Sequence, residues 1–225
     1  MLQILLLFPR ESKRQRDARI QAWARRMLRH LGVELMISGT PAQAGPALLV
    51  SNHISWVDIV ALLAACHCRF VSKADVARWP LFGTLVSGAG TLYVQRVSRR
   101  DAMRVVHRMV QALRDGDILA VFPEGTTSDG STVLAFHSNL IQAAISAQAP
   151  IQAVALRIVD GRTGAASGAA SYVGNESLLG SIWRALRAPE LRVEIKFGEL
   201  QLAAGRDRRS WARDLYGDIA TMRQH

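Results

Sequence analysis

The sequence predicts an α/β fold in which a mixed sheet is flanked by helices. Short apolar runs at residues 46–51 and 117–122 have the composition of strands that are buried on both faces. Between them lie segments whose apolar residues recur every three or four positions, as in amphipathic helices. Residues 191–197 alternate apolar and polar side chains, which indicates a half-exposed strand. Strands that alternate with helices in this way are typical of an α/β sandwich.

Local signals predict each element in turn. Ser55 with Asp58, and Ser98 with Asp101, have the spacing of capping boxes, so each pair predicts the start of a helix. The second helix ends before Gly116, because glycine favours the left-handed position just after a helix. The predicted strands are 33–37, 46–51, 69–72, 90–96, 117–122, 151–159 and 191–197. The predicted helices are 55–65, 98–115, 138–148 and the tail from 208, with a short helix or turn at 79–83 and a loop of small residues at 161–174.

Length and composition limit the class of protein. The 225 residues suit one domain, and a hydrophobic content of 49% is too high for a disordered basic tail. The chain has 28 basic and 18 acidic side chains, which gives a net charge of +10. Cys66 and Cys68 are too close in sequence for ordinary disulfide geometry, so a reduced cytosolic setting is the simplest interpretation.

The positive charge is concentrated at the N-terminus. Residues 1–31 contain eight basic and two acidic side chains, so they contribute +6 of the total, and an anionic partner follows, either lipid or nucleic acid. Within residues 12–31 one apolar stripe, with Trp23 in it, lies opposite several arginines. Such a helix suits a bilayer interface, so residues 1–32 are predicted to be a membrane-associated helical segment. The alternative is a surface helix whose stripe packs on the core.

Spanning and targeting signals are weak. The apolar start, residues 1–8, lacks the flanking features of a signal peptide, and no run approaches the roughly 20 apolar residues of a spanning helix. If the anionic partner is lipid, we expect a peripheral or monotopic protein at the cytoplasmic face of a membrane.

The first candidate for chemistry is the segment from Asn52 to Asp58, where a buried strand gives way to a helix. His53 just before the first turn and Asp58 within it can converge, although they would not share a face in mid-helix. An imidazole held by a carboxylate is suited to act as a general base on a hydroxyl. The alternative is that Asp58 only completes the capping box with Ser55.

The second candidate is the loop from Phe122 to Gly130, which directly follows a buried strand. Its glycines and hydroxyls could cradle an anion, and Glu124 could bind polar substrate groups. It is not a nucleotide-binding P-loop, because the Gly-Lys-Ser ending is missing. The alternative is an ordinary turn.

Taken in order, these segments resemble the motifs of the glycerolipid acyltransferases, the lysophosphatidic-acid-acyltransferase-like family. Asn52, His53 and Asp58 match the first block, Gly90–Arg96 the second, and Phe122–Thr126 the third. A fourth block is half matched, because Pro150 is present but Ala153 stands where a second proline is usual. The matched region, residues 46–160, covers about half of the chain, and residues 33–225 are assigned to the acyltransferase domain.

The resemblance implies acyl transfer from a thioester, either acyl-CoA or acyl carrier protein, to the hydroxyl of a lysolipid. His53 would be the general base and Asp58 its orienting partner. The substrate-binding residues would be Asn52, Arg96, Glu124, Gly125 and Thr126. No cofactor, metal or nucleic acid is implied. The partners would be the two substrates and a membrane lipid surface.

One departure bears on the acceptor. Members that form phosphatidate usually have Arg after the Thr of the third block, whereas Thr127 stands here. The run Glu124–Gly130 looks more like members that acylate lyso-ornithine lipids. 1-Acylglycerol-3-phosphate stays the first expectation because that activity is the commonest in the family, and the lyso-ornithine lipid is the alternative.

Other readings remain open. Cys66-His67-Cys68 could suggest a metal, but no second ligand cluster accompanies it. Lys73 and Asp75 could line the acceptor site, and residues 76–92 could line an acyl-chain tunnel, although loop charges and ordinary core are the simpler interpretations. From another functional class, the chain could be a non-catalytic basic protein that binds membrane or nucleic acid.

Overall fold

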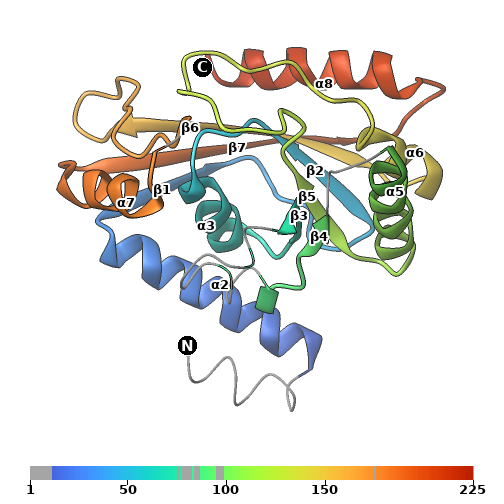
Figure 1. Ribbon diagram of the computed structural model, residues 1–225, viewed down its shortest axis with the longest axis horizontal. Coiled ribbons are helices and arrows are strands. Elements are labelled where there is room, and N and C mark those ends of the chain that lie inside the picture. The colour runs from blue at the N-terminus through green and yellow to red at the C-terminus, as the bar shows by residue number, and fades with distance from the viewer. Residues whose placement is uncertain are drawn as a thin grey trace.

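The computed structural model describes residues 12–74, 77, 83, 87–94, 99–174 and 176–224. Within these residues seven strands form one sheet in the order β1-β7-β6-β2-β5-β3-β4 (Figure 1). The strands are β1 (Val33–Ser38), β2 (Ala47–Ser51), β3 (Arg69–Lys73), β4 (Leu92–Val94), β5 (Ile118–Val121), β6 (Ile151–Asp160) and β7 (Leu191–Gln201). The helices are α2 (Lys13–His30), α3 (Trp56–Ala65), α5 (Arg99–Arg114), α6 (Ile141–Ala147), α7 (Leu178–Arg187) and α8 (Arg208–Met222).

The sheet is mixed because β6 and β7 pair antiparallel, whereas the other described pairs are parallel. The carboxyl ends of β2, β5 and β6 therefore share one edge of the sheet with the amino ends of β7 and β1. The predicted α/β fold with a mixed sheet is confirmed, and the motif-bearing loops after β2 and β5 meet at this edge.

Helices cover both faces of the sheet. Strand β2 is buried along its whole length, and its alternate residues Leu49 and Leu48 belong to separate apolar clusters on the two faces. One cluster includes side chains of α2, α3 and α7, and the other includes those of α5, α6 and α8. Figure 1 shows these two groups of helices on opposite sides of the strands. A strand enclosed in this way needs the continuous apolar run seen at 46–51.

Helix α7 is the element that sequence reasoning missed. The expected loop at 161–174 is largely turns and irregular chain, and the helix begins after it, with Ser177 accepting a hydrogen bond from Gly180 N at 3.0 Å. Its neighbour β7 extends to Gln201, four residues beyond the predicted end. The other predicted strands and helices within the described residues are present, with ends that shift by a few residues.

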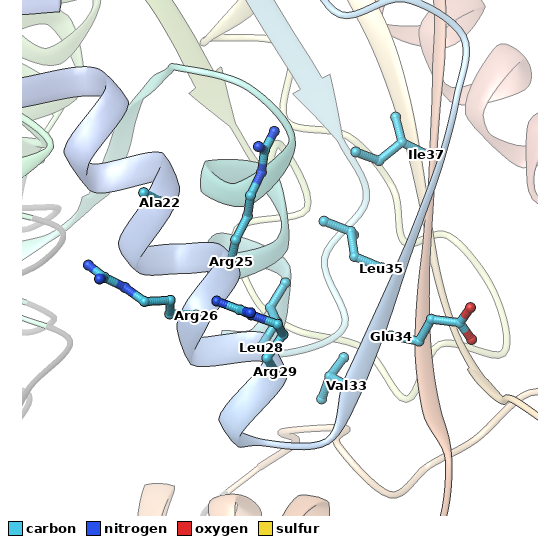
Figure 2. Close-up of a pocket in the computed structure, with 9 residues that line it drawn as sticks. All are labelled: Ala22, Arg25, Arg26, Leu28, Arg29, Val33, Glu34, Leu35 and Ile37. Carbon is cyan, nitrogen blue, oxygen red and sulfur yellow. The ribbon is translucent and has the colours of Figure 1, made fainter. Parts of the chain in front are cut away.

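Helix α2 forms as expected, but its apolar stripe packs on the core. Ile20, Ala24 and Leu28 are at most 3% exposed, and α2 lies against α3. The side chains of Val33, Leu35 and Ile37 point from β1 toward α2, whereas Glu34 points away (Figure 2). The stripe that was predicted to face a bilayer is therefore used to complete the fold, and the alternative of a helix packed on the core describes it.

Several expectations lie outside the described residues. They concern the apolar start at 1–8, the turn at 79–82, Asp75, Arg96 and most of the segment 76–86. Among the described helices, none combines the length and the apolar content that a bilayer crossing requires.

Candidate active site

The site begins where β2 ends and α3 starts. Ser55 is the N-cap of α3, and its hydroxyl accepts a hydrogen bond from Val57 N at 3.3 Å. The Asp58 carboxylate turns back over the same turn, where its Oδ2 atom accepts from Ile54 N at 2.6 Å and from Ser55 N at 2.8 Å. The capping box therefore forms, and it fixes the Asp58 carboxylate above the residues that precede the helix.

The same Oδ2 atom lies 2.8 Å from Nδ1 of His53. Asp58 thus caps the helix and also contacts the imidazole, so it does more than complete the capping box. An ionised carboxylate can only accept, so Nδ1 carries the proton and Nε2 has the free lone pair. Asp58 is fully buried, and its Oδ1 atom has no hydrogen-bond partner among the described residues.

The imidazole of His53 is also held from its face. The ring of Phe122 stacks on it with centroids 3.9 Å apart and planes 9° apart. Phe122 stacks in turn near Phe70, with centroids at 5.8 Å. The His53 side chain remains 16% exposed. The imidazole is therefore held at Nδ1 and on one ring face, and part of the ring still reaches solvent. The sequence motif contained Phe122 but offered no sign of this stacking.

The loop after β5 holds the backbone of His53. Oε1 of Glu124 accepts from His53 N at 2.9 Å, and Oε2 accepts from Leu134 N at 3.2 Å. Ser128 N donates to His53 O at 2.9 Å. Because Glu124 is only 4% exposed, burial raises the pKa of its carboxyl from 4.5 to about 7. The two motif loops are therefore joined through the main chain of His53.

Two residues expected to bind substrate have other partners. Both oxygens of Glu124 are occupied by backbone N–H groups, as described above. Asn52 is 1% exposed, its Nδ2 donates to Leu156 O at 3.0 Å, and its Oδ1 accepts from Leu156 N at 2.8 Å. In this structure the side chains of Asn52 and Glu124 therefore bind backbone groups around His53, and the substrate contacts expected of them stay a prediction.

The rest of the third motif is more open. Gly125 is part-exposed with φ at 73°, a conformation that favours glycine, and Thr126 is exposed. The Thr127 hydroxyl donates to the carbonyl of Tyr172, a residue of the loop before α7. Gly125 and Thr126 thus stay available to a ligand, whereas Thr127 joins two loops.

A basic residue from the C-terminus approaches the same loop. Arg223, just after α8, donates from Nη2 to Gly130 O, and Glu124, Arg157, Asp129 and Asp58 act on its charge. Burial lowers the pKa of Arg223, and its Nε atom has no hydrogen-bond partner in the described part of the chain. No local signal marked this residue, because only the folded chain brings it to the loop.

The Cys66–Cys68 segment lies apart from the His53–Asp58 pair. Both cysteines are free and buried, and His67 Nδ1 lies 3.2 Å from Asp17 Oδ1 of α2. Among the described residues there is no group of three His, Cys, Asp or Glu side chains that could hold a metal ion. Cys66 and Cys68 belong to the apolar cluster that also contains side chains of α2 and α3.

Comparison with known proteins agrees with this geometry. A model of the Acyltransferase family matches residues 10–157. The lyso-ornithine lipid O-acyltransferase of Pseudomonas aeruginosa is 37% identical over 191 residues, 85% of this chain and 72% of that protein. The 1-acyl-sn-glycerol-3-phosphate acyltransferase of Neisseria gonorrhoeae is 35% identical over 169 residues, 74% of this chain and 64% of that protein.

The fold is shared with a solved structure. The 1-acyl-sn-glycerophosphate acyltransferase PlsC of Thermotoga maritima superposes with a TM-score of 0.69 at 18% identity, over 98% of this chain and 83% of that one. The family match spans the His53–Asp58 pair and the Glu124 loop, which are the parts that the fold brings together. This chain is therefore a member of the acyltransferase family.

Proposed function

We propose that this enzyme transfers a fatty acyl group from a thioester, acyl-CoA or acyl carrier protein, to the free hydroxyl of a lysolipid. The observation that carries the proposal is the 2.8 Å contact between His53 Nδ1 and Asp58 Oδ2, which leaves Nε2 free as a base. Relatives named for lysolipid acyl transfer support the substrate class.

The reaction needs one base and no covalent intermediate on the protein. Nε2 of His53 takes the proton of the acceptor hydroxyl as its oxygen attacks the thioester carbonyl carbon. The tetrahedral intermediate then collapses, the carbon–sulfur bond breaks, and the imidazolium returns the proton to the leaving thiolate. Asp58 stabilises the imidazolium between these two steps.

The first acceptor that we propose is 1-acylglycerol-3-phosphate, with Arg96, Gly125 and Thr126 binding its head group. The second candidate is a lyso-ornithine lipid. Thr127 favours that candidate, because it adds no cation and its hydroxyl is occupied by Tyr172 O. The relative from P. aeruginosa supports it as well.

The direct test measures thiol release by the purified protein with acyl-CoA or acyl carrier protein and each of the two lysolipids. We expect His53→Ala to lower kcat by about 10²–10⁴-fold, the usual contribution of a general base, without unfolding the chain. A folded His53→Ala protein with full activity would remove His53 from the mechanism. Arg96→Ala should raise the KM for the acceptor more than that for the thioester.

We also propose that the enzyme works at a membrane surface as a peripheral protein, since a lysolipid acceptor resides there. If the wild-type protein transfers no acyl group but binds anionic vesicles or duplex DNA, the non-catalytic binding function is correct instead.

A further inference from the structure

Helix α7 presents a row of large apolar side chains to solvent. Leu179, Trp183 and Leu186 are 76%, 62% and 47% exposed. Their spacing of four and three residues puts them on one face of the helix. Val173, in the loop that leads into α7, is 45% exposed. Single exposed apolar residues are ordinary, but a contiguous apolar patch marks an interaction surface.

The opposite face of α7 is firmly anchored, so the exposure is a property of an ordered helix. Ser181 and Ala185 are completely buried. The Ser181 hydroxyl accepts a hydrogen bond from Trp56 Nε1 at 3.0 Å. The large apolar side of an amphipathic helix is expected to be covered. In the described part of the chain, the buried residues of α7 are the small Ser181 and Ala185, whereas Leu179, Trp183 and Leu186 stay exposed.

The patch lies beside the His53–Asp58 pair. Trp56, which contacts α7, stands two residues before Asp58 in α3. The loop before α7 donates from Tyr172 N to Ile54 O at 3.2 Å, and Ser55 Oγ donates to Ala170 O. In Figure 1, α7 lies next to α3 at the end of the sheet where β1 and β7 begin. Whatever covers α7 is therefore brought close to the general base.

Basic side chains lie near the patch at this end of the molecule, some of them paired with acidic residues. The Arg187 guanidinium lies 5.3 Å from the centroid of the Trp183 ring. Arg184 is paired with Glu176. Val33 and Leu191 are paired residues at the starts of β1 and β7. The carboxyl ends of α2 and α7, which precede these strands, therefore lie at the same edge of the sheet. Helix α2 ends in the exposed Arg29 and His30. Apolar residues bordered by cations complement an anionic lipid surface.

We propose that the outer face of α7, formed by Leu179, Trp183 and Leu186, is the membrane-docking surface of this enzyme. Its occupant is a bilayer that contains anionic phospholipid. The apolar side chains enter the interface, Trp183 and Arg187 lie at the level of the head groups, and the site receives its lysolipid from the same leaflet. This inference rests on the proposed function, and it gives docking to α7 in place of the buried stripe of α2.

The test is sedimentation with mixed phosphatidylcholine–phosphatidylglycerol vesicles. The double variant Leu179→Ser/Trp183→Ser removes the two most exposed members of the patch. The matched control Leu200→Ser/Leu202→Ser removes side chains that are 49% and 61% exposed, at and just beyond the far end of β7. We expect the first variant to bind vesicles about tenfold more weakly or worse, and the control to bind like the wild type.

A second readout keeps binding apart from folding. Brominated lipid should quench part of the tryptophan fluorescence of the wild-type protein, and Trp183→Phe should keep vesicle binding but lose that quenching. Wild-type binding by the α7 double variant would overturn the proposal. So would a wild-type dimer in sedimentation that the same variant dissociates, because the patch would then join two copies.

Acyl transfer by the wild type to a short-chain acceptor in solution, without vesicles, is scored separately. Its absence would count against the proposed function and would leave the vesicle result unaffected.

Discussion

At the scale of single residues, Glu124 couples the two motif loops through a buried carboxyl. Its oxygens accept hydrogen bonds from His53 N and Leu134 N, yet burial raises the pKa of the carboxyl from 4.5 to about 7. In the unfolded chain the same group ionises near 4.5, so the folded state favours the protonated form. Its contribution to stability is therefore complete below about pH 4.5 and is lost as the pH rises through about 7.

Glu124→Gln should remove this pH dependence. The free energy of unfolding of the wild type, relative to that of the variant, should fall by up to about 3 kcal/mol between about pH 4.5 and pH 8. Urea denaturation across this range measures the difference. A difference that stays constant with pH would show that the Glu124 carboxyl ionises alike in the folded and unfolded chains.

The sequence predicted which residues gather at the site better than it predicted what each side chain contacts. The spacing of His53 and Asp58 at a strand-to-helix junction indicated their contact, because a capping box has a known geometry. Asn52 and Glu124 carried the same motif signal, but they have backbone partners far along the chain, at Leu156 and His53. Partners of that kind follow from the fold and not from local pattern.

At the scale of elements, α2 shows how one amphipathic pattern suits two environments. An apolar stripe with arginines opposite fits a bilayer or a protein core equally well. What decides is the neighbouring α3, which is apolar on all sides and buried at every position, so that it must be covered by another helix. The periodicity of α2 alone contains no such information.

Leu28→Ala distinguishes these two roles of the stripe. Leu28 is 2% exposed and packs in the core, so we expect the free energy of unfolding to fall by about 2–5 kcal/mol. Arg26→Ala, on the exposed side of the same helix, is the matched control and should change it by about 0.5 kcal/mol or less. Thermal denaturation of both variants checks this. An unchanged stability of Leu28→Ala would mean that α2 is not part of the folded core.

Helix α7 was not predicted from the sequence. At 100° per residue, Leu178, Leu179, Ile182, Trp183 and Leu186 lie within an arc of about 140° on the side opposite Arg184, so the sequence does contain a helical apolar stripe, and it was overlooked beside the small-residue loop. A helix of ten residues is also marginal by itself, and it depends on tertiary packing such as that of Ser181 on Trp56. The part of the apolar stripe that stays exposed, Leu179, Trp183 and Leu186, is the surface that we propose for docking.

At the scale of the whole molecule, the sheet is stepped. Strand β2 ends at Ser51, opposite Val154, whereas β6 and β7 continue as a pair as far as Asp160 and Leu191. His53 lies at the step, with Asn52 bound to Leu156 of the longer strand. Helix α7 lies at this same end of the molecule (Figure 1), so His53 and the proposed lipid surface occupy one end.

The net charge of +10 should act together with α7, and salt separates the two contributions. Attraction between exposed arginines and an anionic leaflet is screened over about 10 Å at 0.1 M salt and over less at higher salt, whereas apolar insertion is not screened. We expect vesicle binding of the wild type to weaken from about 0.05 M to about 0.5 M salt and then to level off at a residual value. Leu179→Ser/Trp183→Ser should keep the salt-sensitive binding and lose the residual binding at high salt. Arg26→Gln/Arg29→Gln should lose salt-sensitive binding and keep the residual binding. Sedimentation across a salt series measures both, and residual binding that survives in the α7 variant would assign insertion to another part of the chain.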